Sequence, residues 1–205
     1  MTIKELLPGR EYADQTLQNL LISGGSLRDC LFSDCKFVKS RLSDIDFESC
    51  FFHNCQFGNC DLSLMRVNNS SFINTSFTDC KMIGINWTDA YWPKGRLLAT
   101  LHFEGCSINH SVLAGLILPR IRITKCVAWE VDFTEADMSE ADCRSTDFAK
   151  SRFYNTNLTG ANFSGATNYT IAPGSNKIKG AKFSLPEAMS LLNNLDIVLT
   201  DDSTA

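Results

Sequence analysis

Apolar residues recur at every fifth position through most of the chain. One series runs from Leu17 to Trp92 without a polar residue, and a second series, displaced by one residue, runs from Leu98 to Phe163. With 44% hydrophobic residues overall, thirty apolar residues at thirty such positions are not a chance result. The positions are Leu17, Ile22, Leu27, Phe32, Phe37, Leu42, Phe47, Phe52, Phe57, Leu62, Val67, Phe72, Phe77, Met82, Trp87, Trp92, Leu98, Phe103, Ile108, Leu113, Leu118, Ile123, Ala128, Phe133, Met138, Cys143, Phe148, Phe153, Leu158 and Phe163.

A second series of mainly small residues lies two positions before the first, and the residues between the two series are mostly polar. A period of five with one large and one small apolar side chain fits neither a 3.6-residue helix nor an alternating strand. It predicts a chain that turns a corner every few residues and stacks successive coils, which is an all-β solenoid. The small series includes Cys30, Cys35, Ser40, Ile45, Cys50, Cys55 and Cys60, and later Ala136, Ala141, Thr146, Ser151, Thr156, Ala161 and Ala166.

Several five-residue units resemble the motif of the pentapeptide-repeat family, which is a small residue, Asp or Asn, a large apolar residue and two polar residues. ADMSE, TDFAK, TNLTG and ANFSG match it closely, and the resemblance covers roughly residues 17–163. It implies a right-handed quadrilateral β-helix with four pentapeptides per coil. We therefore expect residues twenty apart, such as Phe32, Phe52 and Phe72, to stack in columns at a spacing of ~4.8 Å.

The two ends of the chain depart from the repeat. Residues 1–16 predict an N-terminal cap or arm, residues 17–183 the β-helix with a register slip near 93–97, and residues 184–205 a C-terminal cap. In that last segment Ser184 and Glu187 have the spacing of a capping box before a short helix, and residues 196–200 predict a short strand. The segment is more apolar than a cap requires, so we expect a homodimer interface made by Leu191, Leu195, Ile197, Val198 and Leu199.

Cysteines cluster between Cys50 and Cys60, with Cys55 and His53 between them. Zinc would accept three thiols and an imidazole. In a four-sided coil, however, these cysteines lie on three successive walls and do not converge. We therefore expect reduced thiols that pack in the core as small apolar side chains, with a disulfide between stacked thiols as the alternative and no metal site.

The charge of the chain is modestly negative, with a net charge of −4 and a pI near 5.4. This balance disfavours direct binding of nucleic acid. One coil carries an acidic belt, preceded by a small basic cluster at Arg120, Arg122 and Lys125. The belt is either a solubilising surface or an electrostatic mimic of DNA phosphates that attracts a basic protein groove. Its residues are Glu130, Asp132, Glu135, Asp137, Glu140, Asp142 and Asp147.

No pattern of catalytic residues is evident. The histidines His53, His102 and His110 are scattered over outward or turn positions, and no phosphate-binding glycine loop occurs. We therefore expect no catalytic residue and no cofactor. No apolar run reaches the ~20 residues of a membrane helix, and no leader pattern is present. These features predict a cytoplasmic bacterial protein.

Two segments, CKMIGINWTDAYWP and KGAKFSLPEAMSLLNNLDIVL, resemble the branch of the family that confers resistance to topoisomerase poisons, which includes the albicidin-resistance, microcin-immunity, mycobacterial fluoroquinolone-resistance and Qnr proteins. The resemblance implies a DNA-mimicking homodimer with DNA gyrase as its partner. Qnr proteins carry longer loops that quinolone protection requires. Here the only predicted break is the one-residue slip, which either adjusts the coil or exposes Tyr91, Lys94 and Arg96. The slip favours the loop-poor members, which counter other poisons of the albicidin or microcin kind or simply inhibit gyrase, over protection from quinolones, which stays as the further alternative. The alternative function is a scaffold or adaptor that binds an unrelated protein.

Overall fold

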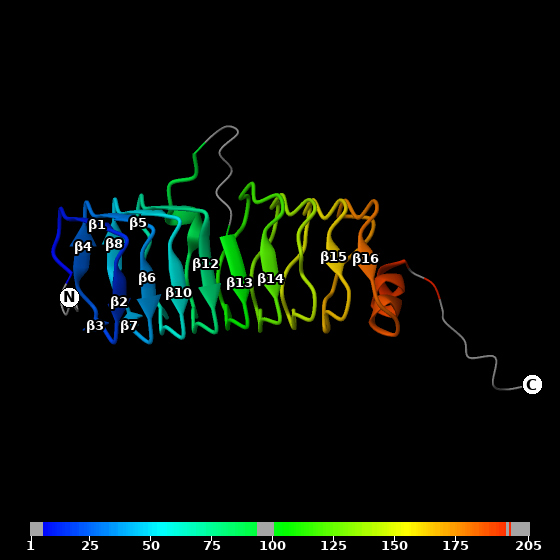
Figure 1. The fold of residues 1–205 in the computed structure, drawn as a ribbon. Coiled ribbons are helices and arrows are strands. Elements are labelled where there is room, and N and C mark those ends of the chain that lie inside the picture. Colours follow the sequence, from blue (N-terminus) through cyan, green and yellow to red (C-terminus); the bar gives the residue numbers. More distant parts are fainter. Residues whose placement is uncertain (1–5, 94–100, 196, 198–205) are drawn as a thin grey trace, which may run out of the picture.

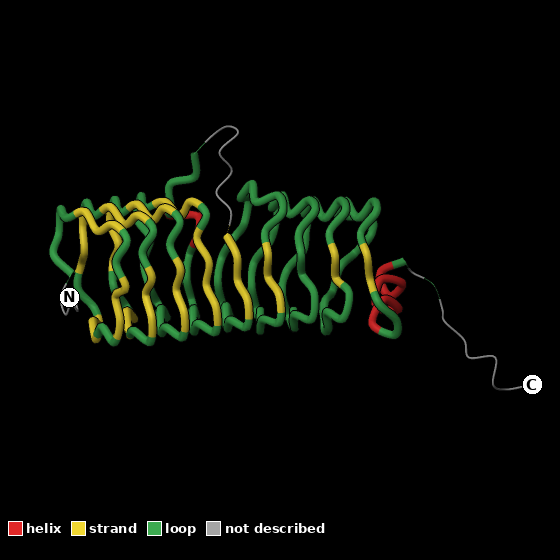
Figure 2. The backbone as a smooth tube through the Cα atoms, in the orientation of Figure 1, coloured by secondary structure: helices red, strands yellow, loops and turns green. Residues whose placement is uncertain are grey.

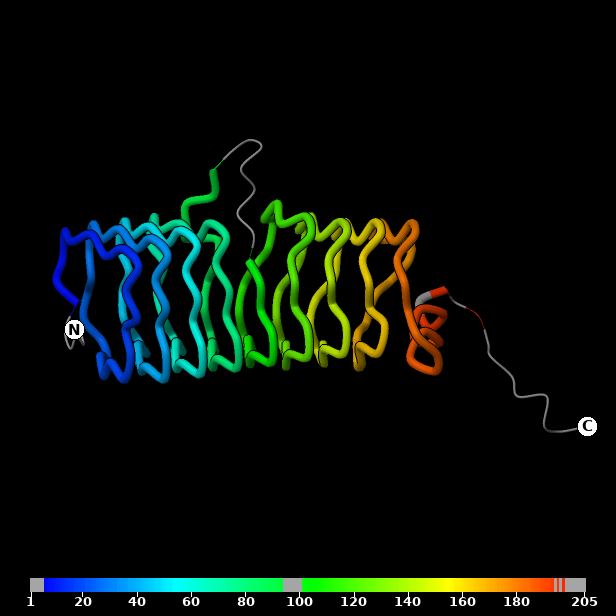
Figure 3. Tube along the Cα trace, viewed as in Figure 1, coloured from blue at the N-terminus to red at the C-terminus, as the bar shows by residue number. Residues whose placement is uncertain are grey.

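The chain winds into a straight rod of stacked coils, with the first coil at one end and a short helix at the other (Figure 1). A computed structural model describes residues 6–93, 101–195 and 197. Successive coils follow one another along the rod in sequence order (Figure 3). The all-β solenoid expected from the sequence is confirmed, as is the short helix near the C-terminus. The strand predicted at residues 196–200 lies outside the described residues.

The strands are short, and they are separated by turns of the repeat. They are β1 (Glu11–Ala13), β2 (Thr16–Gln18), β3 (Leu21–Ser23), β4 (Ser26–Arg28), β5 (Leu31–Ser33), β6 (Lys36–Val38), β7 (Arg41–Ser43), β8 (Asp46–Glu48), β9 (Phe51–His53), β10 (Gln56–Gly58), β11 (Ser71–Ile73), β12 (Thr75–Thr78), β13 (Leu101–Glu104), β14 (Arg122–Thr124), β15 (Asn162–Phe163) and β16 (Lys182–Phe183). Two 3₁₀ helices, η1 (Trp87–Asp89) and η2 (Glu187–Asn194), complete the elements.

Each coil has four walls, which we name in chain order. Wall A carries β1, β5, β9 and β11; wall B carries β2, β6, β10, β12, β13 and β14, and continues to β15 and β16; wall C carries β3 and β7; wall D carries β4 and β8. Every pairing between coils is parallel. Strands dominate the first half of the rod, and isolated bridges continue the same walls in the second half (Figure 2). Walls A, B, C and D follow one another around the four-sided coil, so wall B lies opposite wall D.

The large apolar residues form one inward column on each wall. Phe32 stacks on Phe52 with ring centroids 4.8 Å apart, and Phe52 stacks on Phe72 at the same distance. Of the thirty residues in the apolar series, twenty-seven are buried, Ile22 and Trp92 are partly buried against the core, and Leu98 lies outside the described residues. Buried aromatic rings each remove ~150–250 Å² from water, so these columns supply most of the hydrophobic stabilisation.

The corners of the coil impose a backbone constraint. The residue two positions after most large inward residues has a positive φ, which for residues other than glycine runs from 49° at Lys39 to 62° at Arg120. Left-handed backbone disfavours most side chains, but glycine, Asn and Asp tolerate it best. Asn or Asp occupies most corners in the first half of the rod. The polar residues at this position therefore serve the turn as well as the surface.

The register slip of one residue is wrong, because the structure has an insertion of six residues. Phe77 pairs with Phe103 across 26 residues, whereas the coils before it are offset by 20, as are those after it except where Phe153 pairs with Ile171 across 18. Six residues equal one unit of five plus one, so the period of five is displaced by only one position. Tyr91 still follows the ladder through its N–H to the Ser70 carbonyl oxygen (2.8 Å). The chain then leaves the coil and returns at Leu101, which pairs with Thr75.

The insertion also changes which columns are continuous. Leu113, Phe133 and Phe153 continue the column of Trp87 on wall D, rather than the Trp92 position of wall A as the slip would require. Trp92 instead folds back and donates its indole N–H to the Trp87 carbonyl oxygen (2.8 Å). Each inward column therefore continues on its own wall past the insertion.

Both ends of the rod differ in detail from the sequence expectations. The ladder begins before residue 17, because β1 pairs in register with β5. The capping box is not formed: the Ser184 hydroxyl accepts from the Gly165 N–H (3.2 Å), and the Glu187 carboxylate accepts from the Asn168 N–H (2.6 Å). Both side chains thus satisfy backbone donors of the preceding coil, so they cap the rod rather than the helix.

Adjacent phenylalanines on β9 provide a direct test of the inward column. Phe52→Ala should lower the free energy of unfolding by about 3–5 kcal/mol, because Phe52 is 1% exposed and packs between two rings. Phe51→Ala, one residue earlier and 44% exposed, should cost less than about 1 kcal/mol. Urea unfolding followed by circular dichroism measures both, and equal losses would contradict the assignment of faces.

Candidate protein-binding surfaces

The acidic belt encircles the rod instead of forming one face. Asp132 lies on wall D, Asp137 on wall A, Asp142 on wall B and Asp147 on wall C. Glu130, Glu135 and Glu140 occupy the corners between these walls. The structure therefore brings the seven carboxylates into about one coil but points them in different directions. A flat partner surface reaches only some of them, whereas a partner groove that wraps around the rod reaches more.

The four aspartates of the belt also hold the backbone in place. The Asp132 carboxylate accepts from the Thr134 N–H (3.0 Å), the Asp137 carboxylate from the Ser139 N–H (2.9 Å), and Asp142 and Asp147 accept in the same way from the residue two positions on. Such bonds are a property of short polar side chains in turns. The Asp132 and Asp142 side chains are only 18% and 22% exposed, so they contribute less charge at the surface than the sequence indicates.

The three glutamates of the belt are exposed at the corners. Glu130 contacts the His110 Nδ1 (3.2 Å) and the Lys150 Nζ (3.6 Å), and Glu140 contacts the Arg120 Nε (2.8 Å). Glu135 has no ion pair within the described part of the chain. Exposed pairs of this kind contribute ~0–1 kcal/mol to stability, so a partner can compete for these carboxylates.

Charge is separated between the two opposite walls B and D. Wall D carries six carboxylates and three cations, a net charge of −3, and wall B carries six cations and three carboxylates, a net charge of +3. The charged residues of wall D are Arg28, Asp29, Asp46, Glu48, Arg66, Asp89, Asp132, Glu135 and Arg152; those of wall B are Lys36, Lys39, Asp79, Glu104, Arg122, Lys125, Asp142, Arg144 and Lys182. The basic cluster of the sequence is split, since Arg120 lies at a corner and pairs with the belt.

The C-terminal end leaves apolar side chains in solvent. Among the predicted interface residues, Leu191 packs against the core, while Leu195 is 46% and Ile197 54% exposed. Val198 and Leu199 lie outside the described residues. The sequence did not single out Leu185 or Met189 as interface residues, yet both are exposed, Leu185 just before η2 and Met189 within it. Together with Leu195 and Ile197 they are the exposed large apolar side chains of this end.

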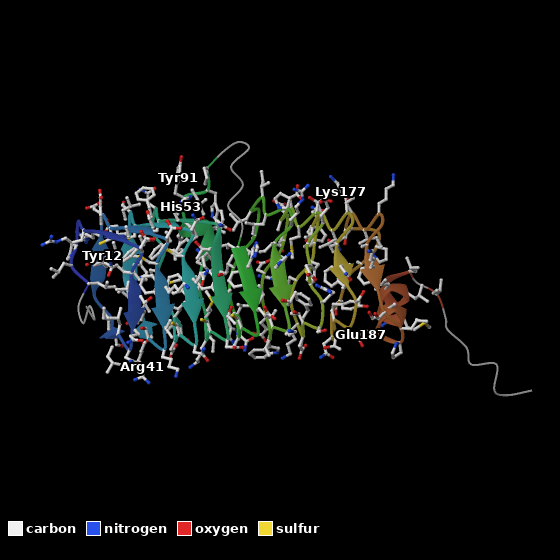
Figure 4. The ribbon with its side chains drawn as sticks, in the orientation of Figure 1. Tyr12, Arg41, His53, Tyr91, Lys177 and Glu187 are labelled. Carbon is white, nitrogen blue, oxygen red and sulfur yellow. The ribbon has the colours of Figure 1, made fainter. Side chains whose placement is uncertain are left out.

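Wall A carries an exposed apolar ladder, interrupted by Ser71, that the sequence analysis missed. Leu31 pairs with Phe51, Phe51 pairs with the buried Ser71, and Tyr91 lies on the coil beyond, beside the insertion. The three apolar side chains are 37–52% exposed, and Tyr91 projects from the wall near His53 (Figure 4). Reading the residue before each inward position at the true coil period would have found them. Grouped apolar side chains on an otherwise polar surface are typical of protein contacts.

The cysteines are core residues, as expected. All nine are buried and unpaired. Cys50 donates its thiol to the Leu27 carbonyl oxygen (3.3 Å), and Cys60 donates to that of Phe37 (3.4 Å). Burial raises the pKa of the Cys50 thiol to about 12. Because the thiolate is the reactive form, this thiol is chemically inert.

The histidines are dispersed over the surface, with His53 on wall A, His102 on wall B and His110 at a corner. Among the described residues, no three His, Cys, Asp or Glu side chains gather closely enough to hold a metal ion. No described helix has the length and apolar character needed to cross a membrane.

Comparisons with known proteins agree on the fold. The profile described as "Pentapeptide repeat region" matches residues 26–113 and 50–133, and the profile "Pentapeptide repeats (8 copies)" matches residues 130–165. No curated protein matches the chain. A trypsin-treated variant of QnrB1, a plasmid-mediated fluoroquinolone resistance protein, superimposes with a TM-score of 0.71 at 17% identity, over 95% of this chain and 92% of that one. Full-length QnrB1 gives 0.64 at 18% identity, over 93% and 92%.

Asp137 separates the structural role of the belt aspartates from their charge. Asp137→Asn should leave the free energy of unfolding nearly unchanged, because Asn157 already makes the same bond to the Thr159 N–H (3.2 Å). Asp137→Ala should lower it by about 1 kcal/mol, since the Ser139 N–H loses its acceptor. Urea unfolding midpoints measure both variants. An Asn variant as unstable as the Ala variant would show that charge, not hydrogen bonding, holds the turn.

Proposed function

This chain belongs to the pentapeptide-repeat family, and from that membership we propose that it is a non-enzymatic protein that binds DNA gyrase or a related type II topoisomerase as a mimic of the DNA duplex. By occupying the DNA-binding groove it protects the enzyme from a poison of the albicidin, microcin or quinolone kind. It acts in the bacterial cytoplasm, where gyrase works. The observation that carries the proposal is the straight rod, whose coils present charged side chains at regular intervals along their outside.

The arrangement of negative charge supports this function. A groove that binds duplex DNA is basic and is attracted to negative charge. Wall D has a net charge of −3, with Arg28, Arg66 and Arg152 each paired to one of its carboxylates. The exposed belt glutamates Glu130 and Glu135 flank this wall at its two corners. We propose that these glutamates, with the belt aspartates beside them, contact the partner.

The insertion after Tyr91 removes the reason to set quinolones aside. Quinolones were disfavoured because the sequence indicates a one-residue slip and no longer loop. The coil that leaves wall A near Trp92 holds six more residues than its neighbours. QnrB1, whose rod superimposes on this one, is a fluoroquinolone resistance protein. Quinolones therefore stand beside the albicidin and microcin classes as candidate poisons.

We also propose that two chains join through their C-terminal ends. Leu195 and Ile197 lie beyond the last coil, where the rod has no further coil to stack on. Covering them with a second chain removes apolar surface from water at about 25 cal/mol per Å². Tail-to-tail joining would double the length of the rod and give it the two-fold symmetry of a DNA-bound topoisomerase.

A second candidate function is that of an adaptor for another protein. The exposed ladder of Leu31, Phe51 and Tyr91 supports it, because duplex DNA presents no apolar ridge of this kind. In this alternative the rod is a scaffold, and the acidic belt only keeps it soluble.

A supercoiling assay with purified gyrase tests the proposed partner. The wild-type protein should inhibit supercoiling or relieve inhibition by a poison at micromolar concentration, and Glu130→Gln/Glu135→Gln/Glu140→Gln should weaken the effect by at least about tenfold, since three exposed charges leave the contact. The matched control removes three carboxylates from other coils and away from wall D, Glu11→Gln/Asp34→Asn/Glu104→Gln, and it should keep full potency. No effect of the wild-type protein on gyrase rules out this function, and full potency of the belt variant rules out the belt as the contact.

Sedimentation velocity tests the proposed dimer with two substitutions of the same chemistry. Ile197→Asp should shift the protein towards monomer, because it buries a charge in the apolar contact. Ile117→Asp, at an even more exposed position (68% against 54%) in the middle of the rod, should leave the dimer intact. A monomeric wild-type chain would contradict the proposal.

A further inference from the structure

Wall B has a groove that the proposed function does not use. It runs along the rod from Ser76 to Ser164, crosses five successive coils and encloses about 440 Å³. Coils repeat at ~4.8 Å, so the groove is about 19 Å long. One side is formed by His102, Arg122 and Asp142, and hydroxyl groups of serine and threonine line much of the rest. Its length and polar lining suit an extended chain rather than a compact small molecule.

The cations of the groove differ in how they are held. Arg144 binds the Asp142 carboxylate through two nitrogen atoms (both 2.7 Å), and Lys125 binds Glu104 (2.8 Å). Arg122 has no ion pair with any residue that the structure describes. A guanidinium on a rigid strand with an open fork of donors is a ready site for a carboxylate.

His102 lies beside Arg122 on the same side of the groove, in register on β13 and β14. Burial and the Arg122 guanidinium both lower the pKa of His102. The imidazole is therefore neutral near pH 7. A negative group placed between these two side chains would favour its protonation.

The rest of wall B extends the positive charge in both directions along the rod. Lys36 and Lys39 lie before the groove and Lys182 after it, and none of them has an ion pair within the described residues. The wall therefore keeps a net charge of +3 on a protein whose net charge is −4. A concentration of cations against the overall balance marks a surface for an anionic partner.

We propose that this groove binds an extended, Asp- and Glu-rich segment of a partner protein. An extended strand rises ~3.3 Å per residue, so about six residues fill the groove, and alternate side chains face its floor. Arg122 takes a carboxylate directly, and Lys125 and Arg144 exchange their intramolecular partners for those of the segment. Single-stranded nucleic acid is disfavoured because proteins that bind it use aromatic side chains as stacking platforms. Among the described residues, His102 is the one aromatic side chain at an outward position of wall B. The groove lies on the wall opposite wall D, and Asp142 is the one belt residue that lines it, so a gyrase contact at Glu130 and Glu135 leaves most of the groove accessible.

Fluorescence anisotropy with a labelled peptide of about twelve alternating Glu and Ser residues tests the proposal. We expect saturable binding that weakens with salt and that is lost when Gln replaces Glu in the peptide. Arg122→Gln should weaken binding about tenfold, in line with the loss of one charge-assisted contact. Lys177→Gln, which removes from wall A an exposed cation that forms no ion pair with the residues the structure describes (Figure 4), should have no effect.

NMR titration of His102 supplies a readout specific to the groove. Saturating peptide should raise the pKa of His102 in the wild-type protein and leave the imidazole resonances of His53 and His110 in place. Absence of peptide binding overturns the proposal, as does an equal loss of affinity in the Lys177→Gln variant. Tighter binding of a twelve-residue oligothymidylate than of the peptide, with the same shift at His102, would assign the groove to nucleic acid instead.

Discussion

The stacking of each coil on the next is the interaction on which the whole structure depends. Every inward side chain has its counterpart directly above and below, as in the column of Phe32, Phe52 and Phe72. Because the ladder is local, stability is largely a sum of terms between neighbouring coils. Six extra residues can therefore leave the rod after Trp92 without disturbing it, provided that Leu101 returns to its place against Thr75.

The sequence predicts the fold well because the large inward residues obey one period without exception. It predicts the insertion poorly, because a repeat of five shows only how far its phase is displaced. An insertion of six residues shifts the phase by one position, as an insertion of a single residue would. Residues lie on the same face of the rod when they are one coil apart, not when they are close in the sequence. Asp132, Asp137 and Asp142 are close in sequence yet lie on three walls, whereas Leu31 and Phe51 are distant and adjacent. The cap at Ser184 and Glu187 could not be predicted, because their acceptor roles require knowing which backbone donors the last coil leaves open.

A four-walled rod can present four different surfaces to its surroundings. Here walls B and D carry opposite net charge, wall A carries an apolar ladder, and the C-terminal end exposes Leu195 and Ile197. Apart from the acidic belt, which encircles the rod, these surfaces lie on different sides of the molecule. The small overall charge of −4 conceals this separation, because the positive wall offsets the negative one.

Acidity in this fold has two physical origins that must be distinguished before charge is taken as a sign of function. An aspartate just before an inward residue accepts a backbone N–H two positions on, and Asn157 and Asn162 do the same without charge. Such aspartates follow from the turn and are largely covered. A glutamate at a corner has no such bond to make and tolerates its positive φ at some cost. Glu130, Glu135 and Glu140 all occupy that position, where Asn or Gly would be less strained. These three glutamates carry charge at positions where the positive φ favours other residues, and their carboxylates are the most accessible to a partner.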